Sequence, residues 1–129
     1  MDGTPMTTDS PAASDATVGF ASAVTATPEW LAWEEASMRV RSDSSAQRAS
    51  AAYDERLRAL RLNLMLQAAS AEEEADLERL HDALIAEPSV VAYREAEAAL
   101  KDLCRATAER LSRAIGLDYA ASCATGCCG

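Results

Sequence analysis

Apolar residues recur along much of the chain at steps of three and four, which is the spacing of one face of an α-helix. Three such runs predict long helices over about 45–67, from Ser70 to Glu87 and from Pro88 to about Ile115. Their apolar positions are Ala46, Ala49, Tyr53, Leu57, Leu60 and Leu64; Leu77, Leu80, Leu84 and Ile85; and Val91, Ala96, Leu100, Leu103, Thr107, Leu111 and Ala114. Each of these helices is expected to pack along a neighbour.

A proline separates two shorter helices that precede the three long ones. The apolar spacing over 18–24 predicts a helix that starts at Asp15 and stops before Pro28, because the residue before a proline is kept out of the helical region. A second helix then extends to about Arg41, with Thr27 as its N-cap and Pro28 at its first position. The sequence therefore predicts five helices.

Other helix ends are marked by capping residues. Ser70 and Glu73 form a capping box, so the glutamate run at 72–74 needs no catalytic explanation. The polar stretch 42–45 offers caps between the second and third helices. Gly116 is suited to the left-handed residue that ends a helix.

An internal repeat relates the two halves of the chain. The segment TPEWLAWEEASMRV, which starts at Thr27, aligns with EPSVVAYREAEAAL sixty positions later. The prolines of the two segments coincide, and Trp33 falls where Tyr93 stands. This predicts two similar units, each with a short helix, a proline break and a longer helix, that pack with approximate two-fold symmetry.

The two ends of the chain differ from its middle. Residues up to Ser14 are rich in Thr, Ser, Pro and Asp and offer almost nothing to bury. We therefore expect a disordered leader over 1–14, a helical domain over 15–116 and a flexible cysteine-bearing tail over 117–129. The expected fold class is all-α, a small bundle of about five helices with an approximate internal repeat.

Composition narrows the classes of partner and compartment. Hydrophobic residues make up 49% of the chain but aromatic residues only 5%, which favours helices that approach closely through alanine. The net charge of −9 repels phosphate backbones and anionic lipid, so direct binding to DNA or to a membrane is not expected. The N-terminus lacks the features of a secretory signal, and no stretch approaches the roughly 20 apolar residues of a membrane span. A cytoplasmic protein is predicted.

Two groups of side chains allow either a structural or a binding role. Trp30, Trp33 and Tyr93 lie near the two proline breaks, where they could pack in the core or form a docking patch for another subunit. Four arginines of the third helix lie off its apolar face, and they form either a solvated face or a docking surface. They are Arg48, Arg56, Arg58 and Arg61.

Three of the four cysteines, Cys123, Cys127 and Cys128, fall within the last seven residues. In a reducing cytosol, clustered cysteines are more often metal ligands or redox thiols than disulfide partners.

The last helix and the tail together resemble a known family. The pattern P-x-V-x-x-Y-x-x-A-E-x-x-L, the helix end Ile115-Gly116-Leu117 and the tail cysteines follow one another, and TPEWLAWEEASMRVRSDSSAQR precedes them. In this order they resemble the YlbF/YmcA family of small all-helical bacterial regulators, over everything after the leader. The pattern occupies Pro88, Val90, Tyr93, Ala96, Glu97 and Leu100.

The resemblance implies a non-enzymatic regulatory subunit. Family members assemble with related subunits and with the partner YaaT into a complex that holds iron–sulfur clusters. That complex acts with the endoribonuclease RNase Y in RNA processing and affects competence, biofilm formation and sporulation. The alternative is a structural homo-oligomer or small adaptor, whose tail binds zinc or nothing.

The implied cofactor needs more thiolates than the tail provides. Iron–sulfur clusters are commonly held by four cysteines, whereas Cys123, Cys127 and Cys128 supply three. A partner subunit or Cys104 could supply the fourth, although Cys104 lies beside the apolar positions of its helix and is expected to be a small buried residue. We therefore expect a [4Fe-4S] cluster completed by a partner. Zinc, thiol–disulfide exchange and a tail without function are the alternatives.

No arrangement of residues indicates catalysis. His81, the only histidine, lies at the edge of an apolar stripe and is expected to be a boundary residue rather than a base. Glu95 and Glu97 are close to Arg94 and Lys101, so ion pairing or solvation explains them better than acid–base chemistry. The sequence contains no H-E-x-x-H motif or phosphate-binding glycine loop.

Overall fold

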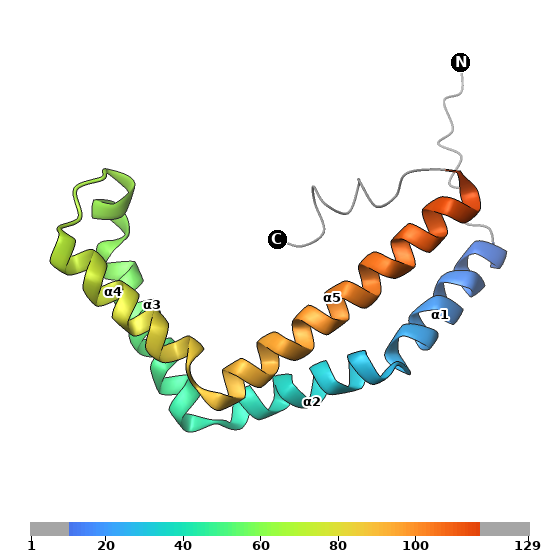
Figure 1. The fold of residues 1–129 in the computed structure, drawn as a ribbon, viewed down its shortest axis with the longest axis horizontal. Coiled ribbons are helices and arrows are strands. Elements are labelled where there is room, and N and C mark those ends of the chain that lie inside the picture. Colours follow the sequence, from blue (N-terminus) through green and yellow to red (C-terminus); the bar gives the residue numbers. More distant parts are fainter. Residues whose placement is uncertain (1–10, 117–129) are drawn as a thin grey trace, which may run out of the picture.

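A computed structural model describes residues 11–116, and this part consists of five α-helices and no strand. The helices form a V when the molecule is viewed down its shortest axis (Figure 1). Their bounds are α1 Pro11–Thr25, α2 Pro28–Ser42, α3 Ser44–Met65, α4 Ala71–Ile85 and α5 Pro88–Ile115. The all-α fold predicted from the sequence is confirmed.

The V is a long helical hairpin that bends near its middle. Helix α2 packs against α5 and helix α3 packs against α4. The chain passes from α2 to α3 and from α4 to α5 at the same place, the bottom of the V in Figure 1. We call α1, α2 and α5 the first arm, α3 and α4 the second arm, and their junction the elbow.

Predicted capping interactions begin and end these helices. The Trp30 amide donates to Thr27 Oγ1 at 3.3 Å. At the start of α4, the Glu73 amide donates to Ser70 Oγ at 3.1 Å, and the Ser70 amide donates to Glu73 Oε1 at 3.4 Å. Gly116 ends α5 with a φ of 70°, in the left-handed region that glycine adopts without strain.

The internal repeat is visible in the backbone at the two proline breaks. The Thr27 amide donates to the Val24 carbonyl at 3.1 Å, and the Glu87 amide donates to the Leu84 carbonyl at 3.2 Å. The next bond along the chain also recurs sixty positions later, since the Leu31 and Val91 amides donate to the carbonyls of Thr27 and Glu87. The two sequence segments therefore form the same local structure.

Few side chains are fully buried in the described part of the chain. The buried apolar residues are Ala36, Ala46 and Leu60. Most of the predicted seam is half-buried, while Val91 and Leu111 are 39% and 48% exposed. A layer of two helices covers only the strip where they touch, which explains why the apolar faces are incompletely buried.

Hydrogen bonds link two helix starts at the elbow. Asp43 is the N-cap of α3, where its Oδ1 accepts from the amides of Ser45 and Ala46 at 3.0 and 3.3 Å. Its Oδ2 accepts from the hydroxyl of Ser89, a buried residue in the first turn of α5, at 2.7 Å. In return, the Ser45 hydroxyl donates to Glu87 Oε1 at 2.9 Å, and Glu87 is the N-cap of α5. Each N-cap thus accepts a bond from the other helix.

Several predicted helix bounds differ from those observed, and one of them is the end of α4, at Ile85 rather than Glu87. Helix α1 begins at Pro11 rather than Asp15, so it includes four residues assigned to the leader, whose residues 1–10 lie outside the described part. Helix α3 ends at Met65 rather than Gln67, and Gln67 has a φ of 53°. Within residues 11–116, no helix is both long and apolar enough to cross a membrane.

Candidate functional site

The predicted aromatic residues come together where α2 and α5 pack. The ring centroids of Trp30 and Trp33 are 5.2 Å apart, and those of Trp33 and Tyr93 are 6.5 Å apart. All three residues are half-buried. The Tyr93 hydroxyl also lies 3.5 Å from Glu97 Oε1. The cluster therefore joins the helices of the first arm, and its use as a docking patch stays a prediction.

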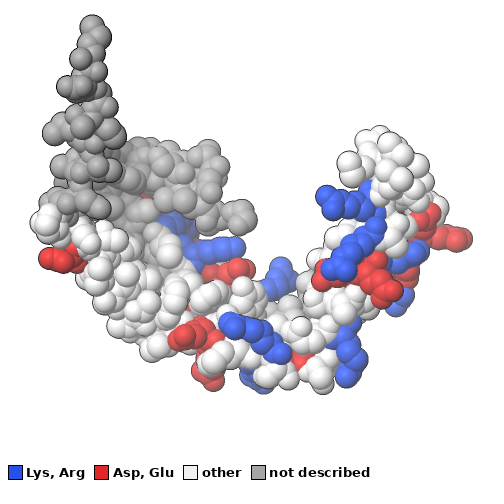
Figure 2. All heavy atoms as spheres, turned by 180° about the vertical axis from the view of Figure 1, so that it is seen from behind, with Lys and Arg blue, Asp and Glu red and all other residues white. Residues whose placement is uncertain are grey.

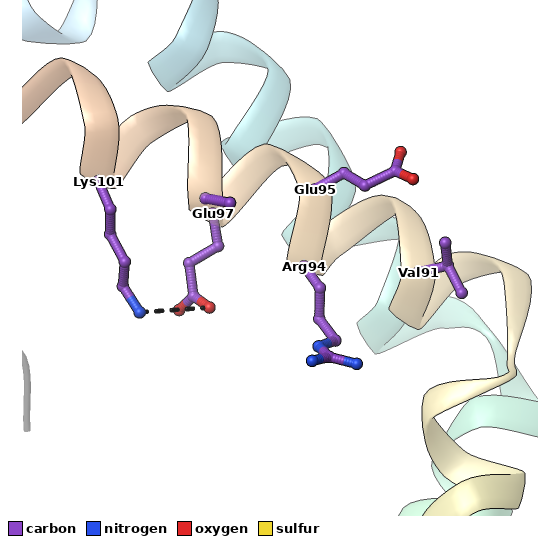
Figure 3. Close-up of a pocket in the computed structure, with 6 residues that line it drawn as sticks. Val91, Arg94, Glu95, Glu97 and Lys101 are labelled. Atoms are coloured by element: carbon purple, nitrogen blue, oxygen red, sulfur yellow. Dashed lines mark ion pairs between the residues drawn. The ribbon is translucent and has the colours of Figure 1, made fainter.

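A shallow hollow of about 430 Å³ lies along α5 (Figure 3). Lys101 Nζ lies 3.6 Å from Glu97 Oε2, as the sequence led us to expect for these charges. Arg94, Glu97 and Lys101 extend to one side of the helix, whereas Glu95 extends in another direction (Figure 3). The described lining residues all belong to one helix and form no enclosed site; they are Val91, Arg94, Glu95, Glu97, Ala98 and Lys101.

A second hollow, of about 340 Å³, is a groove between α3 and α4. The rings of Tyr53 and His81 lie across it from each other, with centroids 5.5 Å apart. The His81 side chain is 49% exposed, and its Nδ1 is 3.9 Å from Asp82 Oδ1, so its predicted place at the boundary of the apolar stripe is confirmed. The residues that line this groove are Tyr53, Leu64, Glu74, Leu77, Glu78 and His81.

The opposite side of the second arm carries an ion-pair network. Arg56 Nε donates to Asp76 Oδ2 at 2.9 Å, which links α3 to α4, and Arg79 pairs with Asp76 Oδ1. The hydrogen bond from Arg79 is the main reason that the pKa of Asp76 is lowered, with the charge of Arg56 adding to it. Asp43 has a lowered pKa as well, mainly because the Ser89 hydroxyl and the Ala46 amide donate to its carboxylate.

The predicted cluster ligands Cys123, Cys127 and Cys128 lie outside the described residues. Cys104 is exposed on α5, so the expectation that it is buried was wrong. Helical spacing gives the direction of a side chain, but it does not say whether another helix covers that turn. Among residues 11–116, no three His, Cys, Asp or Glu side chains gather in a way that could hold a metal ion.

Sequence reasoning missed the hydrogen bonds of the elbow. The residues that form these bonds are visible in the sequence as polar residues at two helix starts. They are Asp43 and Ser45 at one start and Glu87 and Ser89 at the other. Capping rules assign such residues to their own helix. They do not indicate that two starts meet in space.

Comparison with known proteins assigns the chain to a family. Comparison with curated proteins and with solved structures gave no match. One family model, described as control of competence regulator ComK, YlbF/YmcA, matches residues 14–116. This match covers all of α2 to α5 and most of α1. The chain therefore belongs to the YlbF/YmcA family of competence-related regulators.

Proposed function

We propose that this protein is a non-enzymatic regulatory subunit in the cytoplasm, which assembles with related YlbF/YmcA-type subunits and a YaaT-like protein. The assembly would hold an iron–sulfur cluster and modulate RNA processing by an RNase Y-type endoribonuclease. The family match over residues 14–116 carries this proposal. The shallow, open hollows of the described residues, at α5 and between α3 and α4, accord with a role in binding other proteins.

The tail is the proposed contribution of this chain to the cluster. Cys123, Cys127 and Cys128 are its closely spaced thiols, and thiolates are the usual ligands of iron–sulfur clusters. Such a cluster would supply a one-electron redox centre that also links subunits. A related subunit would provide the remaining thiolate, although the exposed Cys104 is a second source on this chain.

Anaerobic copurification of the full chain with candidate partners tests this function. Iron, sulfide and zinc are measured together with the visible absorption spectrum. We expect iron and sulfide in the assembly, and their loss when Cys123, Cys127 and Cys128 are all replaced by serine. Cys104→Ser tests the second source of the remaining thiolate, and it should retain both elements if a related subunit provides that ligand.

Two results would contradict the proposal. If the triple variant keeps its iron, sulfide and partners, the tail is not the ligand set. If the wild-type assembly contains zinc without sulfide, the cofactor is a zinc ion and the iron–sulfur function is wrong.

A further inference from the structure

The last part of α5 carries an apolar strip that is open to solvent. Its residues recur at steps of four, three and four, so they lie on one side of the helix. Cys104 is exposed, and Leu111 and Ile115 are 48% and 47% exposed. We call this set, Cys104, Ala108, Leu111 and Ile115, the α5 strip.

The far end of the second arm is also apolar, and it is white in the charge-coloured view (Figure 2). Leu62, Met65 and Leu66 are 66%, 73% and 67% exposed there. The α5 strip differs from this end in one respect, because residues 117–123 follow the strip directly in the chain.

The cap of α5 favours a return of the chain toward the strip. Gly116 has a φ of 70°, and its amide donates to the Ser112 carbonyl at 2.9 Å, which is the bond of a left-handed helix cap. In such caps, the residue after the glycine commonly contacts an apolar residue in the last turns of the helix. These two positions are Leu117 and Leu111 in this chain.

The composition of residues 117–123 suits an apolar surface. Leu117 and Tyr119 supply two large side chains, and Asp118 is the only charged residue of the segment. Such a segment gains by covering apolar surface that would otherwise face water. Because it is tethered at the end of the strip, its local concentration there is high, and a few contacts can hold it.

The segment is also long enough to follow the strip to its other end. The helix rises about 18 Å between Cys104 and Gly116. Seven residues of extended chain span up to about 23 Å, so Cys123 reaches the level of Cys104 with length to spare.

We propose that residues 117–123 fold back along α5 and dock on the α5 strip, with Leu117 against Leu111 and Cys123 beside Cys104. The docking deepens the proposed function and rests on it for its biological meaning. A docked tail would present its cluster thiols from a fixed place on the first arm.

Disulfide trapping in the full chain tests this docking. Cys127 and Cys128 are replaced by serine, which leaves Cys104 and Cys123 as the only thiols. The chain is kept alone and free of metal in a glutathione redox buffer. Glutathione disulfide oxidises the two protein thiols to one disulfide and is itself reduced to two glutathione thiols. The equilibrium ratio of disulfide to dithiol, measured by mass spectrometry, gives the effective concentration of one thiol at the other.

A matched control moves the helix thiol to another side of α5. Cys104→Ser with Ala106→Cys places it at an exposed position about 160° away around the helix and slightly nearer to the tail. A freely moving tail would reach both positions about equally. We expect an effective concentration at least tenfold higher at position 104 than at position 106.

Two further variants remove the proposed contact from either side. Leu117→Asn changes the tail, and Leu111→Asn changes an exposed position of the strip. Each should lower the effective concentration at position 104 to that at position 106. Circular dichroism confirms that the helices of each variant are formed.

The inference is overturned if positions 104 and 106 give equal effective concentrations. It is also overturned if disulfides between two molecules predominate, since the tail would then dock on another chain. The proposed function fails independently of the docking. Iron and sulfide that depend on the tail cysteines support that function even without docking, and a docked tail in an assembly without iron contradicts it.

Discussion

The two arms each pair antiparallel helices, but different residues hold them together. In the first arm, Trp33 and Tyr93 meet across the α2–α5 contact, and the small residues Ala36 and Ser37 are buried beside it. In the second arm, Leu60 and Ala46 are buried, and a leucine seam continues on either side of them. Two antiparallel helices are thus held together by large rings with small neighbours in the first arm and by a regular leucine seam in the second.

The difference bears on what each arm leaves exposed. In the first arm, the described part also includes α1, a third helix that contacts α2. The second arm consists of α3 and α4 alone, and the groove between these two helices remains open. Both arms nevertheless keep large apolar side chains exposed: Val18, Phe20, Leu31, Met38, Val91, Leu111 and Ile115 in the first arm, and Leu62, Met65 and Leu66 at the far end of the second.

The largest predicted effect is in the second arm. Leu60 is 3% exposed, so Leu60→Ala should destabilise the protein by about 2–5 kcal/mol through lost burial and a residual cavity. Urea denaturation at one protein concentration measures the loss. Hydrogen exchange should show that amides of α3 and α4 lose more protection than those of α2 and α5. Equal losses in both arms would mean that the arms unfold as one unit.

A larger side chain in the α2–α5 contact should destabilise the first arm instead. Ala36 is 8% exposed, so Ala36→Leu should force neighbouring helices apart at a cost of about 1–3 kcal/mol. The control is Ala32→Leu, which changes an exposed position of the same helix and should be nearly neutral. Hydrogen exchange should now locate the loss in α2 and α5. A stable Ala36→Leu variant would show that the α2–α5 contact has room for the larger side chain.

A smaller effect is expected at the elbow. Ser89→Ala removes the hydroxyl that donates to Asp43 and should cost about 1 kcal/mol, the usual net value of one hydrogen bond. Spin labels placed on the two arms should report a broader distance distribution in this variant. Ser44→Ala, at an exposed position in the first turn of α3, is the control. An unchanged distribution would show that helix packing alone fixes the angle between the arms.

Low pH should produce the smallest effect on stability, through protonation of two carboxylates. The pKa values of Asp43 and Asp76 are lowered from an ordinary value of 3.8. A lowered pKa in the folded state adds stability above the unfolded value, and this stability is lost as pH falls through the folded pKa. The free energy of unfolding should therefore decline as the pH falls below about 4.

The variants Asp43→Asn and Asp76→Asn, one in the elbow and one in the second arm, separate the two contributions. Each should flatten the pH dependence of unfolding in that range, while Asn at position 43 still caps α3. If both profiles match the wild type, other carboxylates cause the acid sensitivity.

Features that depend on neighbouring residues along the chain could be predicted from the sequence. The N-caps Thr27 and Ser70 and the left-handed Gly116 were correct because capping is local. The apolar positions of α3 were predicted correctly because their spacing shows which face of the helix is turned toward its neighbour. The start of α1 was placed too late, although Pro11 has the same first position as the prolines that begin α2 and α5.

Features that depend on a partner element could not be predicted from periodicity. Cys104 has a seam-like position on α5 but is exposed, because burial requires a neighbour at that turn. The bond between Asp43 and Ser89 joins residues 46 positions apart, and the polar residues of each segment do not show that the two helix starts meet. The cluster ligands of the tail lie outside the described residues, so they stay a prediction.

Because of the elbow, the length of an arm can change without a change in the angle between the arms. Both chain crossings occur at one level, and the Asp43–Ser89 and Ser45–Glu87 bonds involve only residues at the starts of α3 and α5. One extra helical turn at the far end of α3, matched by one at the start of α4, would lengthen the second arm by about 5 Å. Such an insertion would leave these bonds and the first arm in place. Two proteins with this fold could therefore differ in reach while they keep the same bend.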